Sequence, residues 1–94
     1  MYNQKDLDQL IREMAHWDQP FRYQMLDRMR TDCEYFLGPG VRLSKYLWAG
    51  DPQLQIAFMK VLWNSFPEGE KPEWLSFARI CQMERQMMDQ QGQN

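Results

Sequence analysis

Residues 51–66 read DPQLQIAFMKVLWNSF, and this segment decides the fold because its helix has almost no polar side. An Asp-Pro pair at its start is typical of a helix N-terminus, where aspartate caps amide groups and proline suits the first turn. At about 100° per residue, only Gln53, Lys60 and Asn64 form a polar stripe. A helix that is apolar nearly all round is surrounded by other elements. We therefore predict a central helix over residues 52–66.

Two more helices are predicted before this segment. Apolar residues recur at helical spacing over residues 4–17, where Asn3 and Asp6 resemble a capping pair. A second apolar stripe occupies residues 20–37, after an Asp-Gln-Pro break that supplies an N-cap and a first-turn proline. The Gly38-Pro39-Gly40 turn is expected to end that helix, because glycine accepts the left-handed C-cap conformation and proline cannot continue a helix.

One more helix and one long loop complete the prediction. Ser76 is the expected N-cap of a helix over residues 76–90, which carries its apolar residues on one face. The loop at 38–50, GPGVRLSKYLWAG, is rich in aromatic and aliphatic residues, so we expect it to be ordered and packed down. Residues 91–94 have nothing to bury and are expected to fray. The fold class predicted is all-α, a compact bundle of four helices in a single domain, 1–94.

The overall charge excludes some classes of partner. The chain has 94 residues, with 11 Lys or Arg against 13 Asp or Glu, and a formal net charge of -2. This balance provides no overall field that attracts nucleic acid or an anionic membrane. The first residues have neither the pattern of a signal peptide nor that of a transit peptide, and no apolar run approaches the ~18 to 20 residues that span a bilayer. We therefore expect a cytoplasmic protein with no membrane partner.

Catalytic and metal-binding motifs are not recognisable in the sequence. The single histidine, His16, lies opposite the apolar stripe of its helix, and Cys33 and Cys81 are far apart in the chain. A zinc site usually shows paired Cys or His ligands at short spacing. Both cysteines fall on apolar stripes, so we expect two reduced core thiols instead of nucleophiles. The prediction is no metal, no cofactor and no enzymatic activity.

Glu84 is the one carboxylate that projects into the apolar face of the last predicted helix. Buried without a partner, it would favour its protonated form and could act as a general acid. That role needs a second catalytic group within hydrogen-bond reach, and the sequence identifies none. The alternative is that Glu84 pairs with an arginine or lies where this face reaches water.

Four segments resemble, in order and spacing, the small family called large polyvalent protein-associated domain eleven: CEYFLG at 33–38, LWAG at 47–50, WNSFP at 63–67 and PEWLS at 72–76. The resemblance covers roughly residues 22–88 and leaves the first predicted helix outside it. It implies a protein of a plasmid, phage or conjugative element, either fused into a very large multidomain protein or free-standing. The GPGVR run at 38–42 departs from the more polar run usual in the family, so no loop function is carried over.

The remaining surface features favour protein recognition. Tyrosine and arginine are over-represented at interface hot spots, and methionine adapts to binding surfaces. The candidate partner-binding residues are Gln24, Arg28, Thr31, Tyr35, Arg42, Tyr46, Met83 and Met87. Each also has a structural explanation, because methionines fill core gaps and tyrosines often cap a core. With the setting that the resemblance implies, we predict stoichiometric binding to a host or element protein, an anti-CRISPR-type counter-defence inhibitor being one candidate.

The alternative is a nucleic-acid-binding accessory of a mobile element's transfer or replication apparatus. Basic and aromatic residues are interleaved over residues 22–48, as in proteins that bind single strands. Acidic residues occur on the same helix, however, with Asp32 one turn after Arg28 and Glu34 one turn after Arg30. Such i, i+4 pairs favour a solvated, internally paired face over one that binds phosphates.

Overall fold

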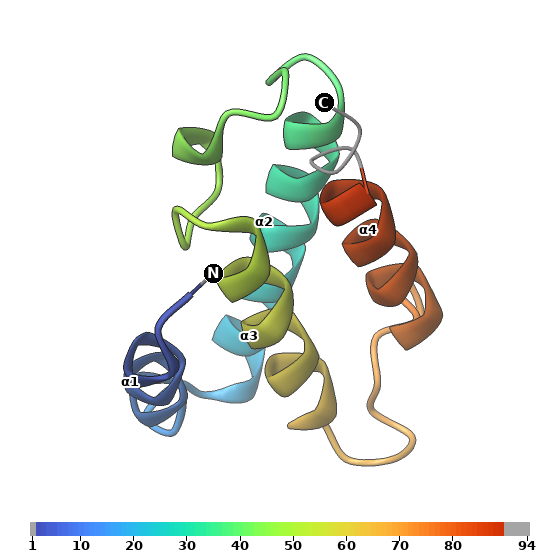
Figure 1. The fold of residues 1–94 in the computed structure, drawn as a ribbon. Coiled ribbons are helices and arrows are strands. Elements are labelled where there is room, and N and C mark those ends of the chain that lie inside the picture. Colours follow the sequence, from blue (N-terminus) through green and yellow to red (C-terminus); the bar gives the residue numbers. More distant parts are fainter. Residues whose placement is uncertain (1, 90–94) are drawn as a thin grey trace.

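The computed structural model describes residues 2–89, and within this range the chain forms α-helices, one short 3-10 helix and no strand (Figure 1). The elements are α1 (Gln4–Met14), α2 (Gln19–Leu37), η1 (Ser44–Tyr46), α3 (Pro52–Asn64) and α4 (Phe77–Asp89). Helix α3 packs against α1, α2 and α4, and it has the middle place in Figure 1. The predicted all-α fold with a central third α-helix is therefore confirmed. The predictions for residue 90 and for a frayed tail at 91–94 lie outside the described residues.

The helices begin where side chains satisfy the first backbone amides. Side-chain oxygens of Asn3, Asp18, Asp51 and Ser76 accept hydrogen bonds from first-turn amides at 2.9 to 3.0 Å. An N-cap of this kind stabilises a helix by ~1 kcal/mol. All four N-caps were expected from the sequence and are confirmed.

Helix α1 is shorter than predicted, ending at Met14 instead of residue 17. The Arg22 guanidinium donates hydrogen bonds to the carbonyl oxygens of Met14 and Trp17, at 3.0 and 3.1 Å. These bonds satisfy acceptors that a longer helix would use. The Trp17 ring packs edge-on against Phe58 and Trp48, with ring centroids 5.9 and 6.4 Å apart. Tertiary contacts, which helical periodicity does not reveal, therefore set this helix end.

Helix α3 ends at Asn64, before the predicted end at residue 66. The Lys71 ammonium lies at this end, where it donates hydrogen bonds to the carbonyl oxygens of residues 63, 64 and 66. A cation at a helix C-terminus is favourable because it compensates the helix dipole. Phe66, which the prediction placed inside the helix, is buried in the turn that follows and stacks on Tyr23 at 4.3 Å between ring centroids.

The core is built mainly from the facing sides of α2, α3 and α4. Its fully buried side chains include Leu26, Met29, Cys33 and Phe36 from α2, Ile56, Phe58, Met59 and Leu62 from α3, and Ile80, Met83 and Met87 from α4. Helix α1 adds Leu7 and Met14 at the edge of this core. Within residues 2–89, none of the helices has the length and hydrophobicity needed to cross a bilayer.

A polar side chain, Gln55, is completely buried within this core. Its amide oxygen accepts a hydrogen bond from the Ala49 amide at 2.9 Å, and its amide nitrogen donates to the Met29 carbonyl oxygen at 3.2 Å. A buried amide without partners would be strongly destabilising, so both bonds matter to the fold. Gln55 thus links α2, α3 and the loop that precedes α3.

The 38–50 loop is held by contacts with other elements, but it is packed down only in part, because Leu47 is buried while Val41, Leu43 and Tyr46 are exposed. The Asp32 carboxylate of α2 accepts a hydrogen bond from the Trp48 amide at 3.0 Å. The Arg42 guanidinium donates to two carbonyl oxygens near the end of α4, at 2.8 and 3.2 Å. These bonds tie the loop to α2 and α4, so its outward side chains are presented in defined positions.

Candidate protein-binding surface

The turn after α2 brings the backbone unusually close to a tyrosine. The Gly40 amide donates to the Tyr35 carbonyl oxygen at 2.7 Å, and the Arg42 amide donates to the Phe36 carbonyl oxygen at 2.9 Å. A Cβ atom at Gly40 would lie 2.8 Å from that Tyr35 oxygen, so a larger residue does not fit. The turn ends the helix as predicted, but its left-handed residues are Val41 and Arg42, with φ of 45° and 62°, and neither of the two glycines. The expectation of a left-handed glycine cap was therefore wrong. Gly40 is needed here because its backbone lies too close to Tyr35 for a side chain to fit.

Val41 combines backbone strain with exposure. A β-branched residue at positive φ is an outlier, and such a conformation costs on the order of 1 to 3 kcal/mol. The Val41 side chain is 71% exposed, so burial within the chain does not offset this cost. Strained residues of this kind cluster at ligand-binding sites, where the surrounding structure holds them in place. Val41 therefore marks the outer side of the 38–50 loop as the candidate site.

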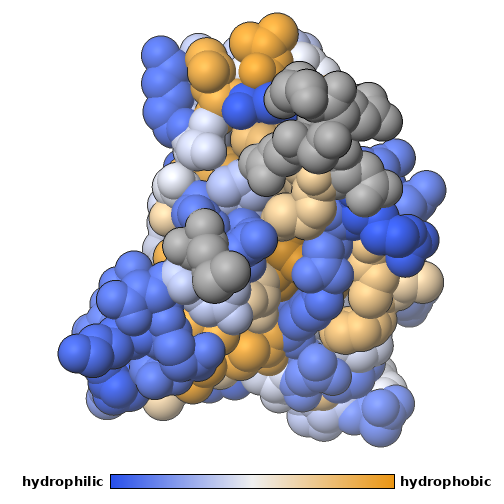
Figure 2. All heavy atoms as spheres, viewed as in Figure 1, coloured by the Kyte–Doolittle hydropathy of each residue, from blue (hydrophilic) through white to orange (hydrophobic). Residues whose placement is uncertain are grey.

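Four large side chains are exposed on this loop and the adjoining end of α2. We call them the loop surface: Tyr35, Val41, Leu43 and Tyr46, which are between 39% and 71% exposed. The Tyr35 and Tyr46 rings meet edge to face, with centroids 5.0 Å apart. The Lys45 amine lies 5.3 Å from the centre of the Tyr46 ring. Figure 2 shows apolar side chains gathered at the end of the molecule where Figure 1 places this loop.

Two predicted residues, Tyr35 and Tyr46, therefore belong to the loop surface, and three others continue it along α2. Gln24, Arg28 and Thr31 are exposed, and their helical spacing places them in one row that leads to Tyr35. The Arg28 side chain is 60% exposed. This row runs along α2 and ends at Tyr35, the residue of α2 that belongs to the loop surface.

Three other predicted residues do not contribute an exposed side chain to this row or to the loop surface. Met83 and Met87 are completely buried, because α4 packs its apolar side against α3. Their assignment to a partner-binding surface was wrong, and they fill the core as methionine commonly does. Arg42 is half-buried and holds the loop to α4, with its guanidinium also 5.8 Å from the centre of the Phe36 ring. Its role visible in the structure is to position the loop.

Sequence reasoning missed Val41, Leu43 and Trp74 as exposed apolar residues. Composition offers no signal for Val41 and Leu43, because the equally apolar Leu47 of the same loop is buried. Trp74 lies between Pro72 and Leu75, both buried, so its neighbours also suggest a packed residue. Only the three-dimensional path of the backbone separates these exposed side chains from the buried ones.

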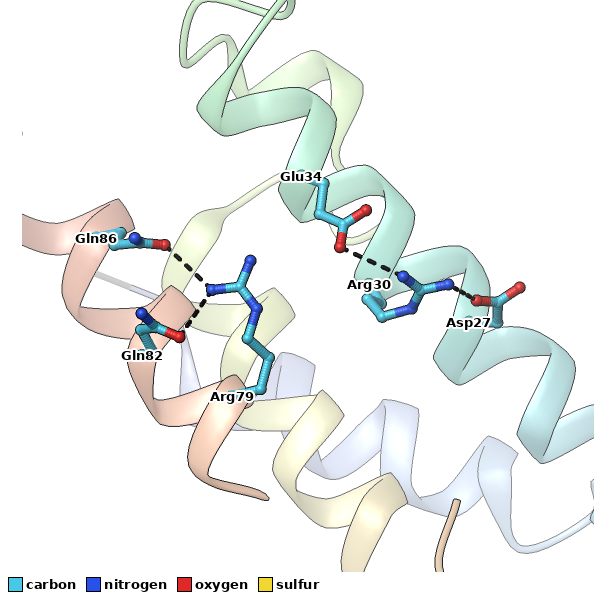
Figure 3. Close-up of polar contacts among 6 residues, drawn as sticks. All are labelled: Asp27, Arg30, Glu34, Arg79, Gln82 and Gln86. Carbon is cyan, nitrogen blue, oxygen red and sulfur yellow. Dashed lines mark hydrogen bonds and ion pairs between the residues drawn. The ribbon is translucent and has the colours of Figure 1, made fainter. Parts of the chain in front are cut away.

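The charged residues of α2 between Asp27 and Glu34 are paired with one another, as their spacing predicted. Arg28 lies 3.6 Å from Asp32, and Arg30 lies 3.3 Å from Glu34. Figure 3 shows Arg30 between Asp27 and Glu34, bonded to both. The hydrogen bond to Asp27 raises the pKa of the Arg30 guanidinium. The carboxylates of this helix therefore compensate much of its positive charge.

Of the groups weighed for chemistry, Cys33 is buried, Glu84 is paired and His16 is exposed on the surface. Burial raises the pKa of the Cys33 thiol from 9.0 to about 12. Cys81 is half-buried, which corrects the expectation of two fully buried thiols, because it lies at the edge of the α4 face that packs inward. The Glu84 carboxylate accepts a hydrogen bond from Lys60 at 2.8 Å, so its partner is a lysine and not the arginine considered. No three His, Cys, Asp or Glu side chains within residues 2–89 gather closely enough to hold a metal ion.

Comparison with known proteins gives a family but no close relative. No curated protein and no solved structure shows significant similarity to the chain. Residues 19–87 match the family described as large polyvalent protein-associated domain 11, which agrees with the resemblance seen in the sequence. The matched segment begins with α2 and ends within α4, so it contains the whole loop surface and excludes α1. Because the match covers most of the sequence, the chain belongs to the large polyvalent protein-associated domain 11 family.

Proposed function

We propose that this chain is a non-catalytic protein-binding module of a mobile genetic element, with the loop surface as its contact face. It acts by stoichiometric binding to a host or element protein in the cytoplasm. The family supports a setting in large polyvalent proteins and the elements that encode them. The most specific form of the proposal is a counter-defence inhibitor of the anti-CRISPR type, which binds a host protein and blocks its working surface.

The observation that carries this proposal is the strained, exposed Val41 within an ordered apolar surface. Fully burying a valine or leucine side chain is worth roughly 1.5 to 3 kcal/mol, and a partner that covers Val41 and Leu43 gains that stabilisation. Tyr35 and Tyr46 supply the residue type that is enriched at interface hot spots. Because Asp32 and Gln55 already hold the loop backbone, little conformational entropy is lost on binding.

Two further observations support a role without catalysis. Cys33 is enclosed by the core, with its sulfur 3.7 Å from the Met59 sulfur, so it is no accessible nucleophile. Glu84 is paired with Lys60, and both are distant in sequence from the residues of the loop surface. The residues that stand out by exposure and strain are apolar and aromatic, which suits recognition.

The test is capture of a partner from the source cell on immobilised parent protein and on two aspartate variants. Leu43→Asp places a charge in the loop surface, whereas Ala78→Asp places the same charge at an exposed position of α4. A partner of the loop surface is retained by the parent and by Ala78→Asp and is weakened at least about tenfold by Leu43→Asp. Equal retention by Leu43→Asp, with an unchanged melting temperature, contradicts the proposal.

A second candidate function is nucleic-acid binding, which the local charge of the loop favours. Residues 35–50 contain Arg42 and Lys45 and no acidic residue, next to two exposed tyrosine rings. Binding to phosphates falls steeply between ~50 and ~200 mM salt, and removing one contacting cation lowers the salt slope by about one. Single- and double-stranded oligonucleotides titrated with the parent, Lys45→Gln and Arg28→Ala across that range separate the two functions. Nuclease treatment during the capture experiment gives an independent check.

A further inference from the structure

A groove is lined by residues of α2 and of the segment that joins α3 to α4. Figure 1 shows that this joining segment begins at the end of the molecule away from the 38–50 loop. The groove consists of two adjoining hollows of about 290 and 560 Å³, which share Tyr23 and Trp74 as walls. Gln24 and Asp27 complete the smaller hollow, and residues 69–73 complete the larger one. We call the pair of hollows the Trp74 groove.

The Tyr23 side of the groove is held by contacts within the chain. The Tyr23 ring stacks on the buried Phe66, with planes 9° apart, and its hydroxyl donates a hydrogen bond to the Glu70 carbonyl oxygen. The side-chain amide of Gln19 donates to the Glu70 carboxylate at 2.6 Å. These contacts fix the position of one wall and of one carboxylate before any ligand binds.

The wall formed by Trp74 is held in place by buried neighbouring residues, while the Trp74 side chain stays accessible to solvent. Pro72 and Leu75 are buried on either side of Trp74, and the Leu75 carbonyl oxygen accepts a hydrogen bond from the Trp63 indole at 2.9 Å. The Trp74 side chain itself is 45% exposed. The Arg30 guanidinium lies 5.5 Å from the centre of the Trp74 ring, yet Arg30 lines neither hollow. Trp74 thus already contacts one guanidinium while it keeps surface facing the groove.

The charge of the groove is negative. Its lining includes the carboxylates of Glu70 and Glu73, the Asp27 carboxylate, which is already paired with Arg30, and one cation, Lys71. The Lys71 ammonium is engaged by carbonyl oxygens at the end of α3. Neither Glu70 nor Glu73 belongs to an ion pair formed by the described residues. An aromatic wall beside carboxylates that lack cationic partners is complementary to a cationic side chain.

We propose that the Trp74 groove binds an arginine side chain carried by an extended segment of a partner protein. A guanidinium stacks flat on an indole ring and donates two parallel hydrogen bonds to a carboxylate, which suits a wall formed by Trp74 next to Glu70 and Glu73. A lysine has the charge but lacks the flat face and the paired donors. This groove shares Gln24 with the row along α2 but none of the four residues of the loop surface, so the domain holds two partner segments toward opposite ends of α2.

The test is a nuclear magnetic resonance titration of the full chain with a blocked peptide that carries two arginines separated by glycine. The matched control peptide carries citrulline, which keeps the shape of arginine and removes its charge. The arginine peptide shifts the Trp74 indole signal and the amides of residues 69–74, with millimolar affinity, and the citrulline peptide does not. Replacing both carboxylates, Glu70→Gln with Glu73→Gln, weakens binding about two- to fivefold, as does Trp74→Ala. Glu68→Gln, which removes a charge from the same segment outside the groove lining, has a smaller effect.

Three results overturn the proposal. The first is equal binding of the citrulline peptide, which removes the charge argument. The second is an equal loss of affinity in Glu68→Gln, which indicates general attraction to an acidic segment. The third is a set of groove shifts that depends on protein concentration without peptide, which makes a second copy of the chain the occupant. Thermal melts of each variant, together with Leu43→Asp as a folded variant of the other surface, distinguish these results from misfolding and from failure of the loop surface.

Discussion

Helix α3 and the 38–50 loop are neighbours in sequence and both are rich in large apolar residues, but they use them in opposite ways. In α3, Ile56, Phe58, Met59 and Leu62 are completely buried against three other helices. In the loop, Val41 and Leu43 are exposed, and the backbone is held by turn hydrogen bonds within the loop together with hydrogen bonds to α2 and α3. Hydrophobic content alone therefore does not separate a core element from a recognition element.

The difference lies in what fixes each backbone. Helix α3 satisfies its own backbone groups, so its side chains are available for packing on every side. The loop satisfies part of its backbone through turn and 3-10 hydrogen bonds of its own, and Asp32 and Gln55 supply acceptors for the Trp48 and Ala49 amides. These backbone contacts leave Val41 and Leu43 without a packing role, unlike the buried Leu47, and this contrast can be tested by substitution.

The largest effect is expected in the core. Phe58 is completely buried and lies 5.9 and 6.0 Å from the ring centres of Trp17 and Trp48. Phe58→Ala should lower the free energy of unfolding by ~3 to 5 kcal/mol, because it leaves a cavity, whereas Leu43→Ala should change it by less than ~0.5 kcal/mol. Urea unfolding measures both values. If Phe58→Ala fails to fold, Phe58→Leu supplies a milder value, and similar losses at Phe58 and Leu43 would remove the contrast.

The second-largest loss of stability is expected at Gln55, which links α3 to the 38–50 loop. Gln55→Leu keeps the approximate size of the side chain but leaves the Ala49 amide without its partner and removes the additional hydrogen bond to the Met29 carbonyl oxygen, so we expect a loss of ~1 to 3 kcal/mol. Hydrogen exchange at Ala49 should accelerate more than exchange in the middle of α3. Gln53→Leu, a half-buried position of the same helix, is the matched control. Equal behaviour of the two variants would show that the link carries no stability.

The burial of Cys33 in the core can be tested through the pH dependence of stability. Burial raises the pKa of its thiol from 9.0 to about 12, so the unfolded chain loses this proton at lower pH than the folded chain. The resulting stability is fully present below pH 9 and is lost as the pH rises toward 12, by ~1.4 kcal/mol for each unit in between. The parent should therefore lose more stability between pH 8.5 and pH 10 than Cys33→Ala does. Parallel pH profiles of the two proteins in chemical unfolding would contradict this assignment.

The smallest effect is expected in the loop, where a substitution should raise the stability instead of lowering it. Val41→Gly removes the strain of a β-branched residue at a φ of 45°, so it should raise stability by ~0.5 to 1 kcal/mol. Leu43→Gly, at an ordinary φ of -89°, should lower it slightly. Thermal melts of the two variants measure the difference. A loss of stability in Val41→Gly equal to that in Leu43→Gly would show that Val41 is not strained.

Much of the fold follows from local sequence patterns, because caps and apolar spacing act within a few residues. The N-caps Asp18, Asp51 and Ser76 and the central place of α3 were predicted in this way. The failures concern contacts between distant segments. The end of α1 depends on Arg22, and the burial of Met87 depends on how α4 meets α3.

The candidate site was less predictable than the fold. Tyr35 and Tyr46 were identified from residue type, since tyrosine is common at interfaces. Val41 was missed because its strain arises from the close approach of Gly40 to Tyr35, which no periodicity encodes. The acidic lining of the Trp74 groove likewise joins residues that are far apart in the chain.

The way the loop is anchored has a consequence for how this domain can diverge. Asp32 and Gln55 hold the amides of Trp48 and Ala49, and an amide is present whatever side chain its residue carries. Mutations at Val41, Leu43 or Tyr46 therefore leave these anchors in place. A lineage whose partner keeps changing can replace the exposed side chains generation after generation while the anchoring residues persist. Members of the family are then expected to share a fold and differ in what they bind.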